Sequence, residues 1–327
     1  MLIRSTRFNY LAQLALSILL ALALWTPNFW MNTSPKVVDS PTFLYSLLFG
    51  WTKTHTMLAK ILAFVCVFLQ AFMLGELVRT HALSKNPMLV GLIYIVLMSA
   101  QSDWQTLHPF LISNFFIIGG FSYLFKTYDR KEPYEYVFNA SALLALASLF
   151  SASLLPFGLI IFWVFLFYPI NRWREWLIAI LGFAFPFSAL FLWTSLTENL
   201  DVFSEFLTPI TEFENFGKTF ENAAWTIQIF ILAVLLFSFV GVRFLNARGR
   251  YNEISQRKKV MAVMLGLFWV VIVAIFMSNH ALPAYLATLF VFSAFFIAEW
   301  FGQSQRKWLP ELVFYVFVIA AFGVQYL

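Results

Sequence analysis

Charged residues are scarce in this sequence. Only 11% of its 327 residues are charged, while 61% are hydrophobic and 20% aromatic; an ordinary soluble domain is about a quarter charged. A chain with so few charges cannot cover a large core with a water-soluble surface, so the shortage excludes a large soluble domain. About eleven bilayer crossings of about 20 residues each would use about two thirds of the chain.

Cysteine and histidine are also scarce. The single cysteine, Cys66, lies in an apolar run, which excludes an intrachain disulfide, a CxxC redox pair and a thiolate metal site. The four histidines show no HExxH or similar zinc spacing, so we predict no tight metal site built by protein ligands. The net charge of +5 is dispersed in short clusters between apolar segments, which is typical of loops and not of a nucleic-acid-binding face.

Long apolar segments recur along the whole chain and predict an all-α, polytopic transmembrane helix bundle of about eleven helices. The first segment follows Arg4 and Arg7 and has the pattern of a secretory signal, but we expect it to remain as an uncleaved anchor. The fifth and sixth segments meet at Pro156 without a polar loop, so they form either a tight hairpin or a partly re-entrant pair. The predicted segments are 8–25, 57–78, 87–100, 109–125, 136–155, 157–170, 176–195, 223–245, 260–277, 281–300 and 309–326.

The distribution of lysine and arginine orients these helices. With the N-terminus in the cytoplasm, 17 cations fall in cytoplasmic segments and 4 on the opposite side. Lys and Arg near helix ends are retained on the cytoplasmic side, so we predict a multi-pass protein of the cell inner membrane with its C-terminus outside. The most basic run, 243–259, carries no phosphate-loop, GxGxxG or kinase signature, and we interpret it as a loop near anionic lipids.

The chain divides into three parts in this prediction. Residues 1–195 form a membrane module with an outer loop at 26–56 and helices one to seven, and residues 223–327 form helices eight to eleven. Between them, the outer loop 196–222 carries six acids against one lysine, and its phenylalanine spacing predicts an interfacial helix. Exclusion of cations from translocated loops explains much of this acidity; the loop could also bind a divalent cation loosely, and no other cofactor is indicated.

Acidic side chains on the predicted outer side are the first candidates for chemistry. Asp39 lies in the first outer loop and precedes 43–51, an apolar stretch too short to span that we place at the interface. Asp103 and His108 lie five residues apart between the third and fourth helices. A carboxylate near an imidazole can act as a general base or a metal-binding pair. The alternative is that Asp103 caps a turn beside an interfacial Trp104.

Cationic side chains on the same side are the second set of candidates. Lys53 precedes the second membrane helix, Lys60 lies one turn inside it, and His280 falls at the same predicted depth. A lysine at this position either extends to the headgroups or binds an anion. Both alternatives stay open from the sequence alone.

The predicted membrane interior is nearly free of ionisable groups, which counts against coupled transport. Glu76, Glu299 and Glu311 fall at cytoplasmic helix ends beside arginine or lysine, where we expect ion pairs. The fifth helix, 136–155, carries small residues at small-xxx-small spacing and is predicted to pack centrally. The small residues that define this face are Ser141, Ala145, Ser148 and Ala152.

Asp39 in the first outer loop, the stretch 43–51 behind it, and Asp103 between the third and fourth helices together resemble the C superfamily of membrane-embedded glycosyltransferases. The succession of Asn139-Ala-Ser, Leu154-Leu-Pro and Asn171-Arg-Trp-Arg also resembles the sequence pattern of helices four to seven in that superfamily. The resemblance implies a polyprenyl-phosphate sugar as donor, with Asp39 as general base and Asp103 as second acid or metal ligand. It further implies that cations bind the donor phosphate, and the candidates are Lys53, Lys60, His108 and His280.

The chain departs from that superfamily in two respects, because its first loop has one acid where many relatives have two and because a large C-terminal outer domain is lacking. The whole chain more closely resembles an uncharacterised family of polytopic inner-membrane proteins from Bacteroidetes, which implies a compartment and no particular chemistry. The alternative function is therefore a non-enzymatic envelope protein that scaffolds, or conducts a lipid or small solute. Its expected partners are membrane lipids and other membrane proteins, and no nucleic acid.

Overall fold

The computed structural model describes ten stretches of the chain, and within them the protein is entirely helical, without a strand. This confirms the all-α class. The described residues are 10–30, 43–84, 86–100, 105–128, 130–168, 172–198, 225–248, 255–277, 282–304 and 308–326. The acidic loop predicted at 196–222 lies almost wholly outside them.

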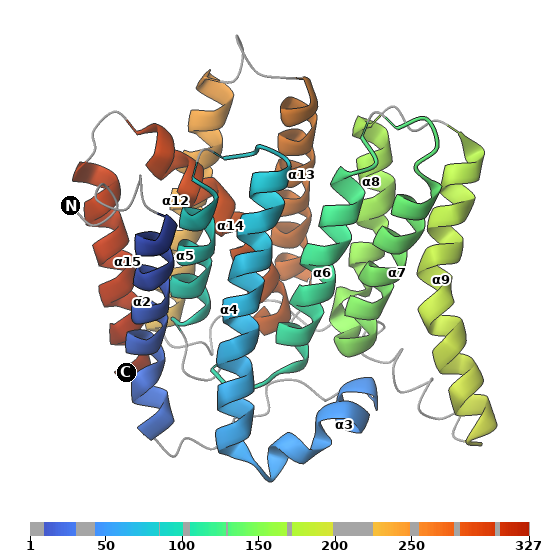
Figure 1. The fold of residues 1–327 in the computed structure, drawn as a ribbon, viewed down its shortest axis with the longest axis horizontal. Coiled ribbons are helices and arrows are strands. Elements are labelled where there is room, and N and C mark those ends of the chain that lie inside the picture. Colours follow the sequence, from blue (N-terminus) through green and yellow to red (C-terminus); the bar gives the residue numbers. More distant parts are fainter. Residues whose placement is uncertain are drawn as a thin grey trace.

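A helix lies at each of the predicted apolar segments, and successive long helices run in opposite directions through the bundle (Figure 1). The short α3 lies across one end of it. The long helices are α2 (Tyr10–Trp30), α4 (Thr56–Thr80), α5 (Pro87–Met98), α6 (Pro109–Phe125), α7 (Tyr134–Phe150), α8 (Leu159–Phe167), α9 (Trp173–Leu196), α12 (Trp225–Arg248), α13 (Ser255–Met277), α14 (Leu282–Gln303) and α15 (Trp308–Tyr326). The short elements are α3 (Phe43–Phe49) and the 3-10 helices η2 (Gly50–Lys53) and η4 (Ala152–Gly158).

Proline marks the start of two of the helices. Pro87 and Pro109 stand at the first turns of α5 and α6, where the missing N–H costs nothing. By contrast, α2 continues through Pro27 to Trp30, five residues beyond the predicted segment. The Asn28 side chain in this last turn is hydrogen-bonded to the segment before α6, and such tertiary contacts can override a local signal to stop.

Within the part of the chain that the structure describes, three helices are long and apolar enough to cross a membrane: α4, α9 and residues Ala284–Gly302 of α14. Large apolar side chains lie exposed on α4 and α9, among them Phe72 and Leu192. Such surfaces fit a membrane protein, in which lipid tails would cover them.

The centre of the bundle is α14, whose apolar stretch is fully buried. It packs against α12 and α13 from the C-terminal half and against α5 and α6 from the N-terminal half. The small residues of the predicted fifth helix are also buried: Ser141, Ala145 and Ser148 lie in α7, which packs between α6 and α9. There Gly182 of α9 approaches α7 so closely that an added Cβ would lie 2.8 Å from the Phe138 carbonyl oxygen. The predicted helix 136–155 was too long, because α7 ends at Phe150 and Ala152 belongs to η4.

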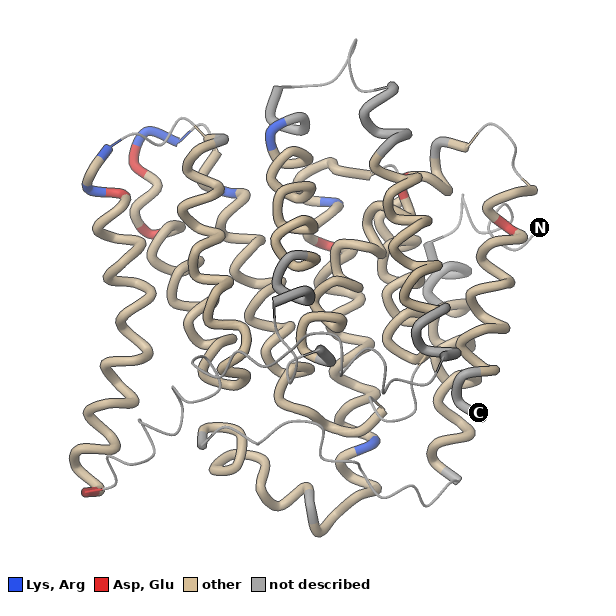
Figure 2. The backbone as a smooth tube through the Cα atoms, turned by 180° about the vertical axis from the view of Figure 1, so that it is seen from behind, with Lys and Arg blue, Asp and Glu red and all other residues tan. Residues whose placement is uncertain are grey.

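The two ends of the bundle differ in charge. Figure 2 shows that the described Lys and Arg gather mainly at one end, which we call the basic end. There α4 and α6 finish with Arg79 and Lys126, and α9 begins after Arg172. The opposite end, crossed by α3, is called the α3 end.

Candidate functional site

The structure describes only some of the predicted site residues. Asp39, Asp103 and His280 lie outside the described residues, so their geometry is not defined, and for Lys53 only the position at the end of η2 is described. Lys60 and His108 are described, and both are at the α3 end of the bundle. The site is therefore built from these two residues and the chain around them.

Lys60 is buried in the second turn of α4, with 4% of its surface exposed. Its Nζ donates a hydrogen bond of 2.6 Å to the backbone oxygen of Asn28, in the last turn of α2. From the sequence, the Lys60 ammonium was expected to reach lipid headgroups or to bind an anion. In the structure it is hydrogen-bonded to a backbone carbonyl. This contact joins the end of α2 to the start of α4.

A polar network extends from Asn28 to the segment before α6. The Asn28 amide donates to the Gln105 backbone oxygen at 3.3 Å, and the Gln105 amide donates to the Ser99 backbone oxygen at 2.9 Å. The Trp25 indole donates to Ser99 Oγ at 2.8 Å. These four residues are buried, and buried polar groups specify a packing arrangement when they are hydrogen-bonded.

A second hydrogen bond reaches the same segment from α3. The Tyr45 hydroxyl donates to the Leu107 backbone oxygen at 2.7 Å. Asn28 precedes, and Tyr45 follows, the stretch 31–42 that contains Asp39. Both flanks of the first outer loop are therefore hydrogen-bonded to residues 105–107, which directly follow the stretch 101–104 that contains Asp103.

His108 stands just before α6 with 7% of its surface exposed. Its Nε2 lies 2.8 Å from Thr106 Oγ1, and its ring stacks on Phe110 with centroids 5.2 Å apart. The imidazole is thus held by its own loop and helix. Among the described residues, no group of three or more His, Cys, Asp or Glu side chains is placed to hold a metal ion.

Sequence reasoning missed a second polar network, in the interior of the bundle. The Tyr94 hydroxyl donates to Gln70 Oε1 at 2.7 Å, and the Gln70 amide donates to the Leu111 backbone oxygen. Asn114 donates to the Ala287 backbone oxygen, and Thr288 donates to Asn114 Oδ1, both at 3.3 Å. The network joins α4, α5, α6 and α14, and isolated Gln and Asn in apolar helices were the signal for it.

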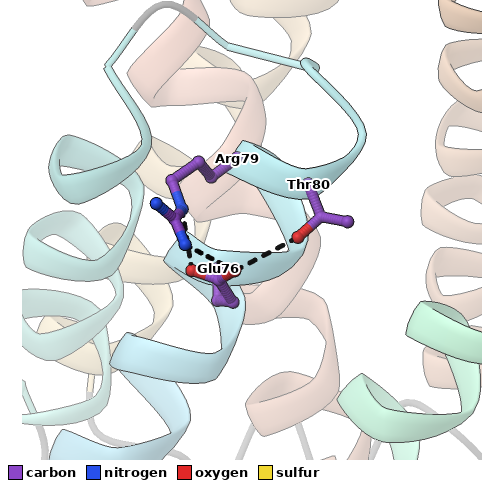
Figure 3. A network of polar contacts seen from close by, with 3 residues as sticks. All are labelled: Glu76, Arg79 and Thr80. Atoms are coloured by element: carbon purple, nitrogen blue, oxygen red, sulfur yellow. Dashed lines mark hydrogen bonds and ion pairs between the residues drawn. The ribbon is translucent and has the colours of Figure 1, made fainter.

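An ion pair at the basic end confirms one of the predicted helix-end pairs (Figure 3). Arg79 donates from Nε and Nη2 to the two carboxylate oxygens of Glu76, each at 2.9 Å, and Thr80 adds a hydrogen bond of 3.3 Å. Glu299 is buried, while Arg306 and Lys307, its predicted neighbours, lie outside the described residues. The two ends of the bundle therefore differ: the basic end has this exposed ion pair, and the α3 end has the buried hydrogen bonds of Asn28 and Lys60.

Comparison of the chain with family models, curated proteins and solved structures gives no match.

Proposed function

We propose that this chain is a multi-pass protein of the cell inner membrane, with eleven transmembrane helices, its N-terminus in the cytoplasm and its C-terminus outside. The support is a helix at every predicted segment, three of them apolar and long enough to span, and the gathering of described cations at one end (Figure 2). The basic end is then cytoplasmic, and the α3 end faces outward.

A topology reporter tests this arrangement. A fusion placed after residue 171, between α8 and α9, should give a cytoplasmic signal, and one placed after Glu198, at the end of α9, should give an outside signal. The first position is informative because α8 has only 9 residues and follows α7 and η4 without a polar loop. An outside signal after residue 171 would contradict the eleven-helix arrangement.

At the outward end we propose glycosyl transfer from a polyprenyl-phosphate sugar. The observation that carries this proposal is the pair of hydrogen bonds from Asn28 and Tyr45 to residues 105–107, because it ties together the flanks of the two stretches that contain Asp39 and Asp103. Asp103 precedes Gln105 by two residues in the chain, and Lys60 and His108 belong to the same end.

In the proposed reaction, Asp39 accepts the proton of an acceptor hydroxyl, and the hydroxyl oxygen attacks the anomeric carbon of the sugar. The bond between that carbon and the donor phosphate oxygen breaks, and polyprenyl phosphate leaves with the electron pair. Cationic groups compensate the phosphate charge, and the candidates are Lys53, Lys60, His108 and His280. Asp103 would act as second acid or would hold a divalent cation.

The test compares Asp39→Asn and Asp103→Asn with Glu198→Gln, which removes an acid at the end of α9 on the same side. We expect each Asn variant to change the profile of lipid-linked sugars or glycans, and the Gln variant to leave it unchanged. Unchanged profiles with normal protein levels would reject the enzyme. Sensitivity of cross-linking or transport to changes in α7 or residues 197–222 would then favour the non-enzymatic alternative.

A further inference from the structure

The end of α4 has a helix cap in which alanine stands where glycine is usual. The Ala82 N–H donates to the Arg79 backbone oxygen at 3.1 Å, and the Leu83 N–H donates to the Val78 backbone oxygen at 2.9 Å. These two hydrogen bonds form a Schellman motif, whose left-handed position is usually glycine. Here Ala82 takes that position with a φ of 49°, a conformation that is unfavourable for a residue with a Cβ. This cap therefore opens more readily than one with glycine.

The residue before Ala82 packs its side chain against α6. The His81 ring stands nearly perpendicular to the buried Phe125 ring, at 83°, with centroids 5.5 Å apart. Its Nε2 is buried and has no hydrogen-bond partner among the described residues. A neutral imidazole has one nitrogen without a proton, whereas both nitrogens of an imidazolium are donors. Protonation would therefore leave a buried donor without an acceptor, which is costly.

The surroundings of His81 also oppose a positive charge. Burial, and then the charge of Lys126 at the end of α6, lower the pKa of His81 below 6.5, and a hydrogen bond to the Ser122 backbone acts in the opposite direction. Glu76, on the same helix, is engaged by Arg79 through both carboxylate oxygens. Residues 82–84 and helix α5 contain no charged residue. An imidazolium at this position is thus repelled by Lys126 and has no described carboxylate to compensate it.

We propose that the end of α4 is a proton-operated switch, in which protonation of His81 expels its ring from α6 and opens the cap at Ala82. The closed state binds the proton less tightly than the open state, so the closed population falls as the pH drops from 6.5 toward the folded-state pKa. The cap leads directly into the connection to α5, so its opening loosens the joint between α4 and α5. The switch does not depend on the proposed glycosyl transfer, and only the compartment whose pH it senses rests on the proposed orientation.

The experiment measures hydrogen exchange of the full chain in detergent, at pH 7.5, 6.5 and 5.5, with each rate corrected for its intrinsic pH dependence. Exchange of a protected amide reports local opening. We expect opening at the amides of Ala82 and Leu83 to rise by up to about tenfold between pH 7.5 and 5.5, which is the limit for one proton and an open-state pKa of about 6.5. Amides at 68–72, in the middle of α4, should stay protected. No rise at the cap, or an equal rise throughout α4, would overturn the local switch.

Variants assign the effect to the proposed residues. His81→Gln should abolish the pH-dependent rise, and His55→Gln is the matched control, because this exposed histidine stands at the other end of α4. Lys126→Gln should reduce the rise, since without its charge the closed state accepts the proton more easily. Ala82→Gly should strengthen protection at every pH and leave the pH dependence in place. A full rise in His81→Gln, or its loss in His55→Gln, would overturn the proposal. If His81→Gln failed to fold, an unreduced rise in Lys126→Gln would overturn it.

Discussion

Gly91 of α5 packs directly against the backbone of α4, and an added methyl group there has no room. A Cβ at this position would lie 2.7 Å from the Ala71 carbonyl oxygen, and ordinary contact begins at 3.4 Å. The obstacle is backbone, which cannot rotate away as a side chain can. Gly91→Ala must therefore push α4 and α5 apart by about 0.7 Å, the difference between these two distances.

This separation also strains the interior polar network. Gln70 precedes Ala71 on α4, and Tyr94 lies almost one turn beyond Gly91 on the same face of α5. Their hydrogen bond is 2.7 Å long, and an opening of about 0.7 Å would bring it near the limit for a hydrogen bond. Overpacking costs about 1–3 kcal/mol, and a weakened hydrogen bond between membrane helices about 0.6 kcal/mol. Alanine regains up to about 1 kcal/mol of helix propensity over glycine, so we expect Gly91→Ala to lower the free energy of unfolding by about 1–2.5 kcal/mol.

The assay is unfolding of the purified protein in detergent, with Gly119→Ala as the matched control. At Gly119, in the middle of α6, the nearest atom to an added Cβ is Leu143 Cδ1 at 3.5 Å, so alanine should be neutral or stabilise by up to about 1 kcal/mol. The double variant Gly91→Ala, Ala71→Gly should not recover stability, because the clash is with a carbonyl. Equal stability of the two single variants, or rescue by Ala71→Gly, would refute the reasoning.

Three further predictions concern the polar contacts. Thr288→Val keeps the shape but removes a hydroxyl that lies 3.3 Å from Asn114 Oδ1 and 3.0 Å from the Ala284 backbone oxygen. We expect a loss of about 0.5–1.5 kcal/mol in the same unfolding assay, and unchanged stability would show that these contacts contribute nothing. Burial, and then the charge of Lys126, lower the pKa of His81 below 6.5. The free energy of unfolding should therefore fall as the pH drops through 6.5 toward the folded-state pKa. His81→Gln should flatten this pH dependence, and a slope of the same size in the variant would contradict the prediction. Tyr45→Phe removes the hydrogen bond from α3 to the Leu107 backbone oxygen, so hydrogen exchange of the amides at 105–108 should become faster. Unaltered exchange would show that this hydrogen bond does not stabilise the segment.

The helices could be predicted from apolar length because each segment carries its own signal. Helix α6 spans 109–125 as predicted, since Pro109 marks its start and Lys126 its end. The continuation of α2 to Trp30 could not be predicted, because it depends on contacts with residues 77 positions away, such as the hydrogen bond from Asn28 to Gln105. The central place of α14 was likewise hidden, because an apolar sequence does not show whether lipid or protein covers it.

For the candidate site, the sequence predicted which residue types lie at the α3 end but not their partners. The position of Lys60 one turn inside its helix was predicted, whereas its bond to a backbone carbonyl depends on how α2 ends. The interior network was missed for the same reason, because Asn114 and Ala287 are 173 positions apart in the chain. Pairings over such distances follow from packing and leave no local pattern.

The interior network also bears on the choice between enzyme and conductor. A path for a polar solute needs side chains that can exchange partners with the solute. In the described bundle, Gln70 uses both its amide nitrogen and its oxygen within the protein, and so does Asn114. The Tyr94 hydroxyl joins these two side chains, and Thr288 contacts Asn114 from α14. All four are fully buried, so their hydrogen bonds hold helices together and offer no free group to a passing solute. These four side chains therefore act in helix packing, and we place the proposed reaction at the α3 end and not in this network.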